Sequence, residues 1–511
     1  MRKAFFISYG LLGIIIGALG FFVSEILYSL FIVYLPLGLL AIYESVQKHH
    51  TIMKNFPLFG RLRYVMEALR PKIYQYFIES DTDGTPVNRI HRSVVYQRAK
   101  KALSTTPFGT QLNMYAEGYE WINHSMSPLD YDEVKPENLR VTVGGRDCKQ
   151  PYSASILNIS AMSYGSLSSN AILALNKGAN TENFAHNTGE GSISQHHLNG
   201  GGSLIWQIGT GYFGCRTKDG KFSEENFKEK ANIENVKMIE IKLSQGAKPG
   251  HGGILPAKKN TPEIAKIRGV EPYTRVVSPA KHSAFNGPRE LLKFVQKLRE
   301  LSNGKPIGFK LCVGRPDEID ELCKIMAETQ IFPDFITIDG GEGGTGAAPL
   351  EFSNSIGMSL VDGLVTMTDA LHKYGIRQEL KIFASGKLIT GFHIIKALSL
   401  GADACYCARA MMLALGCIQA LECNKNTCPA GIATTDPNFA AGLDPDAKAK
   451  RIANFHHQTI EAVAEILAAC GKHKTSELKR SDIWRRTSPT KIESFEQIYP
   501  LPKKVAFKES A

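Results

Sequence analysis

Hydrophobic residues at the start of the chain are grouped into two long runs. Residues 4 to 23 read AFFISYGLLGIIIGALGFFV and contain no charged side chain, which matches the ~20 residues that a helix needs to cross the hydrocarbon layer of a bilayer. Residues 26 to 42 form a second, shorter run that contains Pro36. The two runs predict a hairpin of membrane-spanning helices within residues 1–47.

The charges around these runs predict an orientation. Arg2 and Lys3 precede the first run and Lys48 follows the second, whereas the Ser24-Glu25 link carries no positive charge. Because cationic flanks stay in the cytoplasm, we expect the rest of the chain on the cytoplasmic side of the cytoplasmic membrane. A signal peptide is one alternative, although the first run is long for one and no small-residue cleavage site follows it. A buried core hairpin is another.

From about residue 150, short apolar runs alternate with stretches of helical periodicity. Near-continuous apolar strands of this kind, mostly followed by a helix, are buried on both faces and parallel. Eight of them over roughly 260 residues predict an α/β fold, a (β/α)8 TIM barrel. A doubly wound open sheet is the alternative, but the first strand and helix lack the G-x-G-x-x-G of dinucleotide-binding sheets. The runs are SASILNIS, FAHN, LIWQI, KMIEIKL, PIGFKLCV, FITID, KIFASG and ACYCA.

We expect four segments along the chain. Residues 1–47 are the membrane anchor, 48–149 a linker and packing region, 150–475 the barrel with a cysteine-rich loop, and 476–511 a C-terminal tail. In the second segment, NFPLFGRLRYVMEALRPKIYQYF has apolar residues at helical spacing with basic residues between them. This pattern suits a helix that lies near an anionic membrane face or packs on the main domain.

Composition narrows the classes of function. With 511 residues, 43% of them apolar, the chain can bury a large core. A net charge of +11 would suit nucleic acid, but the basic residues are scattered and no helix-turn-helix or aromatic-interleaved basic motif accompanies them. We therefore expect no nucleic-acid partner. Ten cysteines without the spacing of a disulfide framework indicate a reducing compartment.

Glycine-rich segments follow several later strands, at the end of a barrel where active sites form. DGGEGGTGAAP, residues 339 to 349, lets the backbone approach a flat ligand, although such loops are often only turns. Ser385-Gly386 after the seventh strand and Ala408-Arg409 after the eighth stand where barrels commonly hold a phosphate. One phosphate is indicated, not two.

Basic side chains near the strand ends indicate an anionic ligand. Lys310, within GFKLCV, is expensive to bury unless it faces an anion or an electron-rich ring; the alternative is that it extends to the rim. Lys242, Gln245 and Lys248 follow at three-residue steps, with Arg268 further along. Such a set would suit a dicarboxylate or a 2-oxo acid, and a solvated basic patch is the alternative.

Three cysteines lie within twelve residues just after the eighth strand: Cys417, Cys423 and Cys428. Their C-x5-C-x4-C spacing is one thiolate short of a four-thiolate cluster or a structural zinc site, so it suits a three-iron cluster or a site that borrows a fourth ligand. Zinc would most simply need a histidine, and none lies between Gly401 and His456. Buried cysteines without a metal are the alternative.

Five motifs together identify a known family by their order and spacing. They are SAMSYGSLS (160–168), NTGEG (187–191), IKLSQGAKPG (241–250), GGEGGTGAAPL (340–350) and CIQALECNKNTCPAGIAT (417–434). With them, the chain from about Ser153 to Ile432 resembles the FMN-binding synthase domain of glutamate synthases, in its stand-alone, membrane-anchored bacterial branch. The resemblance implies that the barrel binds FMN, that the three cysteines hold a 3Fe-4S cluster beside it, and that 2-oxoglutarate and ammonia become glutamate.

The resemblance also implies which residues form the site. The 2-oxo acid would meet Lys242, Gln245, Lys248 and Arg268, and Lys310, Lys248 and Gln245 would serve catalysis. The cluster would be held by Cys417, Cys423 and Cys428. FMN would contact Ser160, Ala161, Met162, Ser163, Gly165, Asn187, Gln207, Lys310, Gly340, Gly341, Gly343, Gly344, Thr345, Gly346, Ser385, Gly386, Ala408 and Arg409.

Departures from the family pattern leave the substrate open. A hydrophobic anchor stands where full-length glutamate synthases begin with a glutaminase domain, so we expect no glutamine cleavage by this chain. His251 stands where the family usually has an acid, and Ile254 where it usually has an amide that helps to bind the 2-oxo acid. A related 2-oxo or 2-amino acid, or a different carbonyl substrate, is therefore an alternative to 2-oxoglutarate.

Electrons would reach FMN singly through the cluster. The expected partner is therefore a one-electron donor: a ferredoxin, a reductase subunit or a membrane quinone. A membrane-tethered FMN and iron-sulfur electron-transfer module without turnover is the alternative to an enzyme. The set of lysines and arginine favours the enzyme, since an electron relay needs no anion pocket.

Overall fold

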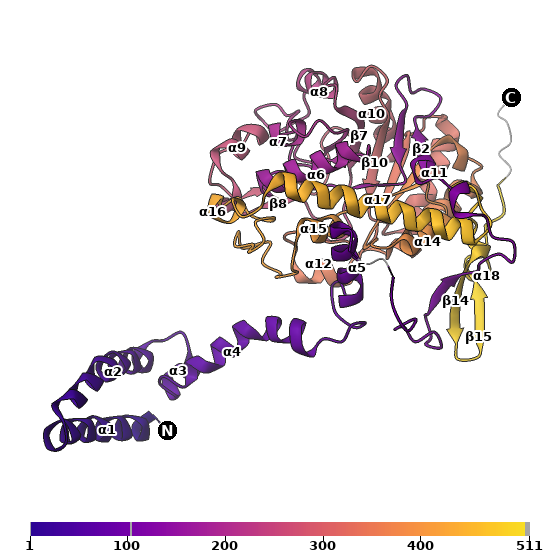
Figure 1. Ribbon diagram of the computed structural model, residues 1–511. Helices are drawn as coiled ribbons and strands as arrows, with labels where there is room; N and C mark the ends of the chain where they lie inside the picture. The colour runs from indigo at the N-terminus through magenta and orange to yellow at the C-terminus, as the bar shows by residue number, and fades with distance from the viewer. Residues whose placement is uncertain (1, 103–104, 506–511) are drawn as a thin grey trace. The chain divides into compact units, whose positions relative to one another are not determined.

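The chain up to Arg89 folds into helices. The computed structural model describes residues 2–102 and 105–505, and its first compact unit ends at Arg89. The elements of this unit are α1 (Arg2–Phe22), the 3-10 helix η1 (Glu25–Leu30), α2 (Phe31–Val46), α3 (Thr51–Asn55), α4 (Gly60–Ile73) and the π-helix η2 (Tyr74–Ile78) (Figure 1).

Helices α1 and α2 form an antiparallel hairpin held by aromatic and glycine contacts. The Tyr34 hydroxyl donates to the Tyr9 carbonyl oxygen (2.7 Å), the Tyr9 hydroxyl donates to that of Tyr34, and the two rings stack with centroids 4.4 Å apart. A Cβ at Gly13 would lie 2.5 Å from the Tyr34 hydroxyl, so this glycine lets the ring approach the helix. Helix α1 and the segment Glu25–Val46, which joins η1 and α2, are each long and apolar enough to cross a membrane, and little of either is buried.

Eight parallel strands close into a barrel in the second unit, which begins at Ile90. The last strand pairs with the first, which confirms the predicted (β/α)8 barrel and excludes an open sheet. The strands are buried on both faces, which explains why continuous apolar runs marked them. In chain order they are β4 (Leu157–Ile159), β5 (His186–Asn187), β6 (Leu204–Ile208), β7 (Val236–Lys242), β10 (Ile307–Leu311), β11 (Phe335–Asp339), β12 (Lys381–Ser385) and β13 (Ala404–Cys407).

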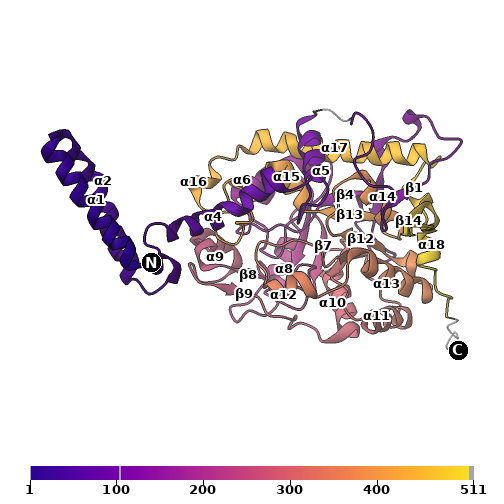
Figure 2. The same cartoon turned by 90° about the horizontal axis from the view of Figure 1, so that it is seen from below.

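Helices surround this barrel. The long helix α17 (Pro445–Ala469) lies beside α6 (Ser169–Thr181) in both views (Figures 1 and 2). A Cβ at Gly178 of α6 would lie 2.6 Å from Ile452 Cβ of α17, so the glycine permits this close packing. The others are α7 (Gln195–Leu198), α8 (Glu224–Ala231), α9 (Pro262–Arg268), α10 (Gly287–Leu301), α11 (Pro316–Thr329), α12 (Leu350–Ser355), α13 (Leu360–Lys373), α14 (Gly391–Ser399), α15 (Arg409–Leu415) and α16 (Pro437–Ala440).

A hairpin of β2 (Arg140–Val143) and β3 (Tyr152–Ser155) packs against one end of the barrel. Its residues Val143 and Ala154 share a buried cluster with Phe335 and Ala404, which begin strands β11 and β13. The amino ends of the strands are thus covered, and the carboxyl ends carry the loops of interest. Outside the barrel lie α5 (Arg89–Lys100), the sheet β1 (Glu120–Ile122), β14 (Ile483–Ser488) and β15 (Lys491–Ser494), the pair β8 (Ile254–Leu255) and β9 (Val276–Val277), and α18 (Phe495–Ile498).

Candidate active site at the carboxyl ends of the barrel strands

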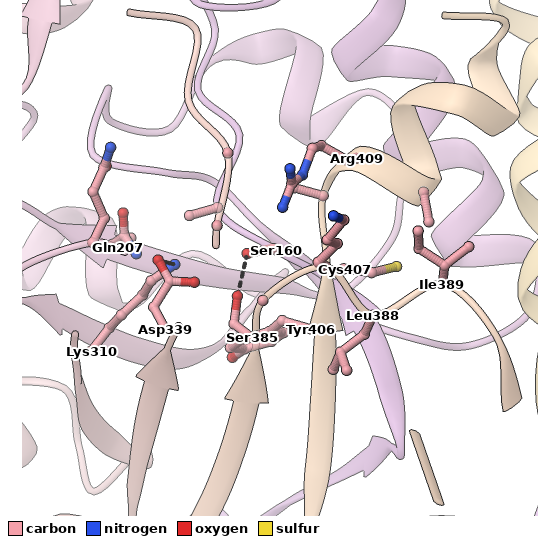
Figure 3. Close-up of a pocket in the computed structure, with 18 of the residues that line it drawn as sticks. Ser160, Gln207, Lys310, Asp339, Ser385, Leu388, Ile389, Tyr406, Cys407 and Arg409 are labelled. Carbon is pink, nitrogen blue, oxygen red and sulfur yellow. Dashed lines mark hydrogen bonds and ion pairs between the residues drawn. The ribbon is translucent and has the colours of Figure 1, made fainter. Parts of the chain in front are cut away.

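A cavity opens at the carboxyl ends of the barrel strands. The empty space in and above it is about 610 Å³, a figure that includes open solvent. Figure 3 shows Lys310 and Asp339 on one side of it and Leu388 and Ile389 on the other. The cavity is lined by Ser160, Ala161, Gln207, Lys242, Gln245, Lys310, Asp339, Gly343, Gly344, Ser385, Gly386, Lys387, Leu388, Ile389, Tyr406, Cys407, Ala408, Arg409 and Ala410.

Lys310 is paired inside this cavity. Its side chain comes from β10, and its Nζ lies 3.2 Å from Asp339 Oδ2 at the end of β11. The same oxygen accepts a hydrogen bond from the Gly246 backbone N–H (2.9 Å). Because a lone ammonium would be expensive to bury, the carboxylate explains how a lysine can lie here. The sequence predicted an anion or an electron-rich ring beside Lys310, and the group that lies there is an anion, the Asp339 carboxylate.

A buried glutamate next to the cavity organises its polar neighbours. Glu240 on β7 is fully buried, and its Oε1 accepts hydrogen bonds from the side-chain amides of Asn187 (2.8 Å) and Gln207 (2.7 Å). Its Oε2 accepts one from the Thr337 hydroxyl (2.6 Å). One carboxylate therefore fixes both predicted flavin contacts on β5 and β6. Sequence reasoning missed Glu240, whose signal is an acid inside the apolar run KMIEIKL.

Cations gather where the sequence predicts a phosphate. Gly386, Ala408 and Arg409 line the cavity, and so does Lys387, which sequence reasoning missed. Gly386 has φ 151°, a conformation that residues with a side chain rarely adopt. Burial lowers the pKa of the Lys387 ammonium, and the neighbouring Arg409 lowers that pKa further. An anion bound here would relieve that repulsion.

The predicted substrate cations converge on one carboxylate. Glu190, in the NTGEG motif, places its Oε2 3.1 Å from Lys242 Nζ. Burial alone would raise the pKa of Glu190, but Lys242, Arg268 and Lys248 outweigh burial and hold that pKa below its ordinary value. A Cβ at Gly253 would lie 1.9 Å from Glu190 Oε1, so glycine makes room for the carboxylate. Glu190 was also missed, although its motif was recognised.

Lys248 and Arg268 are oriented by backbone carbonyls. Lys248 Nζ donates to the carbonyl oxygen of Ala347, in the glycine-rich loop (2.9 Å), and Arg268 Nη2 donates to that of Tyr164 (3.1 Å). Burial is the main cause that lowers the pKa of Lys248 to about 8 and that of Arg268 to about 10. An ammonium whose pKa is this close to neutrality can exchange a proton with a bound substrate.

The cysteine-rich loop lies beside the glycine-rich loop. A Cβ at Gly346 would lie 4.0 Å from Cys423 Cβ. Burial, and to a smaller degree the nearby Cys423 and Cys428 thiols, raises the pKa of Cys417 to about 11. Lys259 also interacts with Cys423 and Cys428. Within residues 2–102 and 105–505, no three His, Cys, Asp or Glu side chains are arranged to hold a metal ion, so the cluster stays a prediction.

Only part of the predicted flavin and substrate site lines the cavity. Its lining includes ten of the predicted flavin contacts and also Lys242 and Gln245. Asn187 connects to this lining through Glu240, and Lys248 and Arg268 connect to it through Glu190 and Lys242. The predicted residues outside the lining are Met162, Ser163, Gly165, Asn187, Lys248, Arg268, Gly340, Gly341, Thr345 and Gly346.

The two departures from the family pattern follow the substrate motif. His251 Nδ1 lies 2.8 Å from the Gly252 carbonyl oxygen, and its ring meets that of Phe352 edge-on with centroids 5.4 Å apart. Ile254 begins β8 and is half-buried. This end of the site therefore contains an imidazole and an alkyl group where the family pattern has an acid and an amide.

Comparisons with known proteins identify the family to which the chain belongs. A family model described as the conserved region in glutamate synthase matches residues 99–473. The glutamate synthase large subunit-like protein YerD of Bacillus subtilis (strain 168) is 37% identical over 491 residues, which cover 88% of this chain and 93% of that protein. An archaeal glutamate synthase (NADPH) of Methanocaldococcus jannaschii is 33% identical over 322 residues, which cover 63% of this chain and 60% of that enzyme.

Proposed function

Because the chain belongs to the glutamate synthase family, we propose that it is an FMN-dependent oxidoreductase that reductively aminates a 2-oxo acid with ammonia. It is an enzyme of the class that acts on CH–NH2 donors, and 2-oxoglutarate is the first substrate to test. The observation that carries the proposal is the convergence of three buried cations on Glu190, beside the cavity that Lys310 lines.

The cavity suits FMN in its charge and lining. Lys387 and Arg409 would hold the phosphate together with the backbone at Gly386. A Cβ at Gly344 would lie 2.9 Å from Arg409 Cδ, so this glycine lets the glycine-rich loop and the Arg409 side chain lie close together at the cavity. When bound, FMN supplies the hydride that converts an imine into an amine.

Residues of this chain would bind the 2-oxo acid and control one proton. Lys242 and Arg268 supply positive charge for its carboxylates. Gln245 lines the cavity and can hydrogen-bond the same substrate. With a pKa of about 8, Lys248 Nζ can give a proton to the carbonyl oxygen that leaves as water when ammonia adds. Lys310, paired with Asp339, would lie in the same cavity as the bound substrate.

We also propose that Cys417, Cys423 and Cys428 hold a 3Fe-4S cluster that passes single electrons. Their spacing and mutual interaction support this, as does the contact of Cys423 with the loop of Gly346. Lys259 would offset part of the thiolate charge. The donor would be a ferredoxin, a reductase subunit or a quinone.

The hairpin of α1 and α2 is proposed to anchor the enzyme in the cytoplasmic membrane, with the barrel in the cytoplasm. The length and apolar character of Arg2–Phe22 and Glu25–Val46 support the anchor, and Arg2, Lys3 and Lys48 support the orientation. Alkaline carbonate washing should leave the full-length protein in the membrane. Its release into the supernatant would contradict the anchor.

An anaerobic activity screen tests the enzymatic proposal. The purified protein is supplied with a reduced one-electron dye, ammonia and a panel of 2-oxo acids, and amino-acid products are identified by mass spectrometry. We expect one 2-oxo acid to be aminated, Lys248→Met to abolish turnover, and Lys258→Met, at an exposed lysine, to leave turnover unchanged. Bound flavin and iron without turnover of any 2-oxo acid would favour the electron-transfer module.

A further inference from the structure

Helix α4, which follows the anchor, leaves an apolar face exposed. Leu62 is 63% exposed and Met66 50%, and the only residue of the helix that is buried is Gly60. An uninterrupted exposed apolar face of this kind usually marks a surface that contacts another phase or molecule. The face follows the i, i+3, i+4, i+7 spacing of a helix and consists of Leu62, Val65, Met66, Leu69 and Ile73.

Basic residues border this face on both sides. Arg63 and Arg70 are seven residues apart and share one border, whereas Arg61 and Lys72 are eleven apart and share the other. Residues 48 to 78 contain six lysines and arginines but one acidic residue, Glu67. Long basic side chains at such borders can extend to lipid phosphates while the apolar face lies among acyl chains.

The start of α4 is fixed to one end of the hairpin. Glu44, near the end of α2, is buried; its Oε1 lies 2.7 Å from Arg61 Nη2, and its Oε2 accepts the Leu58 backbone N–H (2.7 Å). The Phe59 ring meets the ring of Phe5, near the start of α1, edge-on at 6.2 Å. Helix α4 therefore begins at the end of the hairpin that the flanking positive charges assign to the cytoplasm.

We propose that α4 lies in the headgroup layer of an anionic membrane, with its apolar face toward the acyl chains and with Arg63, Arg70 and Lys72 on lipid phosphates. This inference rests on the proposed membrane anchor, which brings α4 to the bilayer surface. The opposite face is occupied within the same unit, because the Tyr64 ring lies against that of His50 with centroids 4.7 Å apart. The π-helix η2, which follows α4 directly, contains Tyr74, Tyr76 and Phe77, aromatic residues suited to the membrane interface.

Tryptophan quenching in vesicles tests this placement. The full-length protein is reconstituted with brominated phosphatidylcholine, with or without phosphatidylglycerol, and the three native tryptophans are subtracted as background. Leu69→Trp reports the apolar face, Tyr64→Trp the opposite face, and Ile15→Trp the anchor. Bromines near the headgroup end of the acyl chain should quench Leu69→Trp strongly and Tyr64→Trp weakly, and the contrast should increase with phosphatidylglycerol.

Charge variants then separate the lipid contact from the anchor. Serine at Arg63, Arg70 and Lys72 should lower the quenching of Leu69→Trp on anionic vesicles to the level of Tyr64→Trp. Serine at three exposed lysines of the barrel unit should not; these are Lys218, Lys293 and Lys324.

Three outcomes would overturn the inference. If Ile15→Trp is quenched by deep bromines but Leu69→Trp and Tyr64→Trp respond equally, the anchor stands and α4 does not lie in the headgroups. If Leu69→Trp emits at short wavelength and is not quenched at either depth, α4 packs on protein instead. If Ile15→Trp itself is not quenched, the anchor fails, and the inference fails with it.

Discussion

Glu240 permits a paired substitution that separates hydrogen bonding from charge in the barrel lumen. Glu240→Gln keeps an oxygen that can accept from Asn187 and Gln207, and its new amide can donate to the Thr337 hydroxyl. Glu240→Met has a similar length but leaves the three donors without an acceptor. Both variants remove the same negative charge, so the difference between them reports the hydrogen bonds.

The size of this difference follows from the three short contacts. The donors lie 2.6 to 2.8 Å from Glu240 and are buried with it. Because each buried donor without an acceptor costs about 1–3 kcal/mol, Glu240→Met should be about 3–9 kcal/mol less stable than Glu240→Gln. For a domain of this size each kcal/mol lowers the midpoint of thermal unfolding by about 2 °C, so we expect a gap of at least ~6 °C.

Thermal unfolding in detergent, together with the FMN content of each purified variant, measures both consequences. Glu240→Gln should keep FMN near the level of the unsubstituted protein. Glu240→Met should also lose FMN, because the Gln207 side chain that lines the cavity is no longer held. Equal midpoints and equal FMN content in the two variants would refute the view that this carboxylate organises the flavin side of the site.

Three further predictions concern the substrate and the cysteine loop. Arg268→Ala should raise the apparent KM for the 2-oxo acid about ten- to a hundredfold, the equivalent of a charged hydrogen bond of roughly 1.5–3 kcal/mol, with FMN unchanged; an unaltered KM would remove Arg268 from the substrate site. Since Lys248 is a cation below its pKa of about 8 and neutral above it, KM should rise as pH increases through about 8. The Lys248→Arg variant keeps a charged guanidinium, so the same rise of KM in that variant would assign the pH dependence to another group. Serine at Cys417, Cys423 or Cys428 should remove about three irons per chain and the odd-electron paramagnetic signal of the oxidised cluster while FMN remains; stoichiometric zinc without iron in the unsubstituted protein would contradict the cluster.

The barrel could be predicted from sequence because its signal is local. A strand such as FITID is buried on both faces, so most of its residues are apolar and its only charged residue, Asp339, ends it; the run is visible without knowledge of its neighbours. The shortest strand of the barrel, His186–Asn187, was predicted only because the run FAHN was counted as the second of the eight strands. Its two residues carry little periodic signal, and its place depends on pairing with β4 and β6.

The acidic members of the site could not be assigned in the same way. The sequence shows Glu240 inside an apolar strand, but only the register, which aligns it with Gln207, shows that it reaches the amides of two other strands. Glu190 belongs to a recognised motif, yet its role depends on Lys242, which lies 52 positions further along the chain. Basic residues were easier to assign because an anionic ligand was already expected, whereas acids that bind the protein's own cations have no such cue.

The balance of charge around Glu190 bears on the substrate class. Lys242 pairs with the Glu190 carboxylate, and Lys248 and Arg268 act on it electrostatically, so the cluster has an excess of basic side chains; burial, and to a smaller degree Lys242, lowers the pKa of Lys248. A dicarboxylate would balance this excess, whereas a monocarboxylate would leave part of it buried. Bound negative charge would raise the pKa of Lys248 again, so that the ammonium is protonated when the carbonyl oxygen needs a proton. Ile254 replaces a neutral amide and leaves this charge balance unchanged; its alkyl side chain alters which 2-oxo dicarboxylate fits and not the preference for two carboxylates.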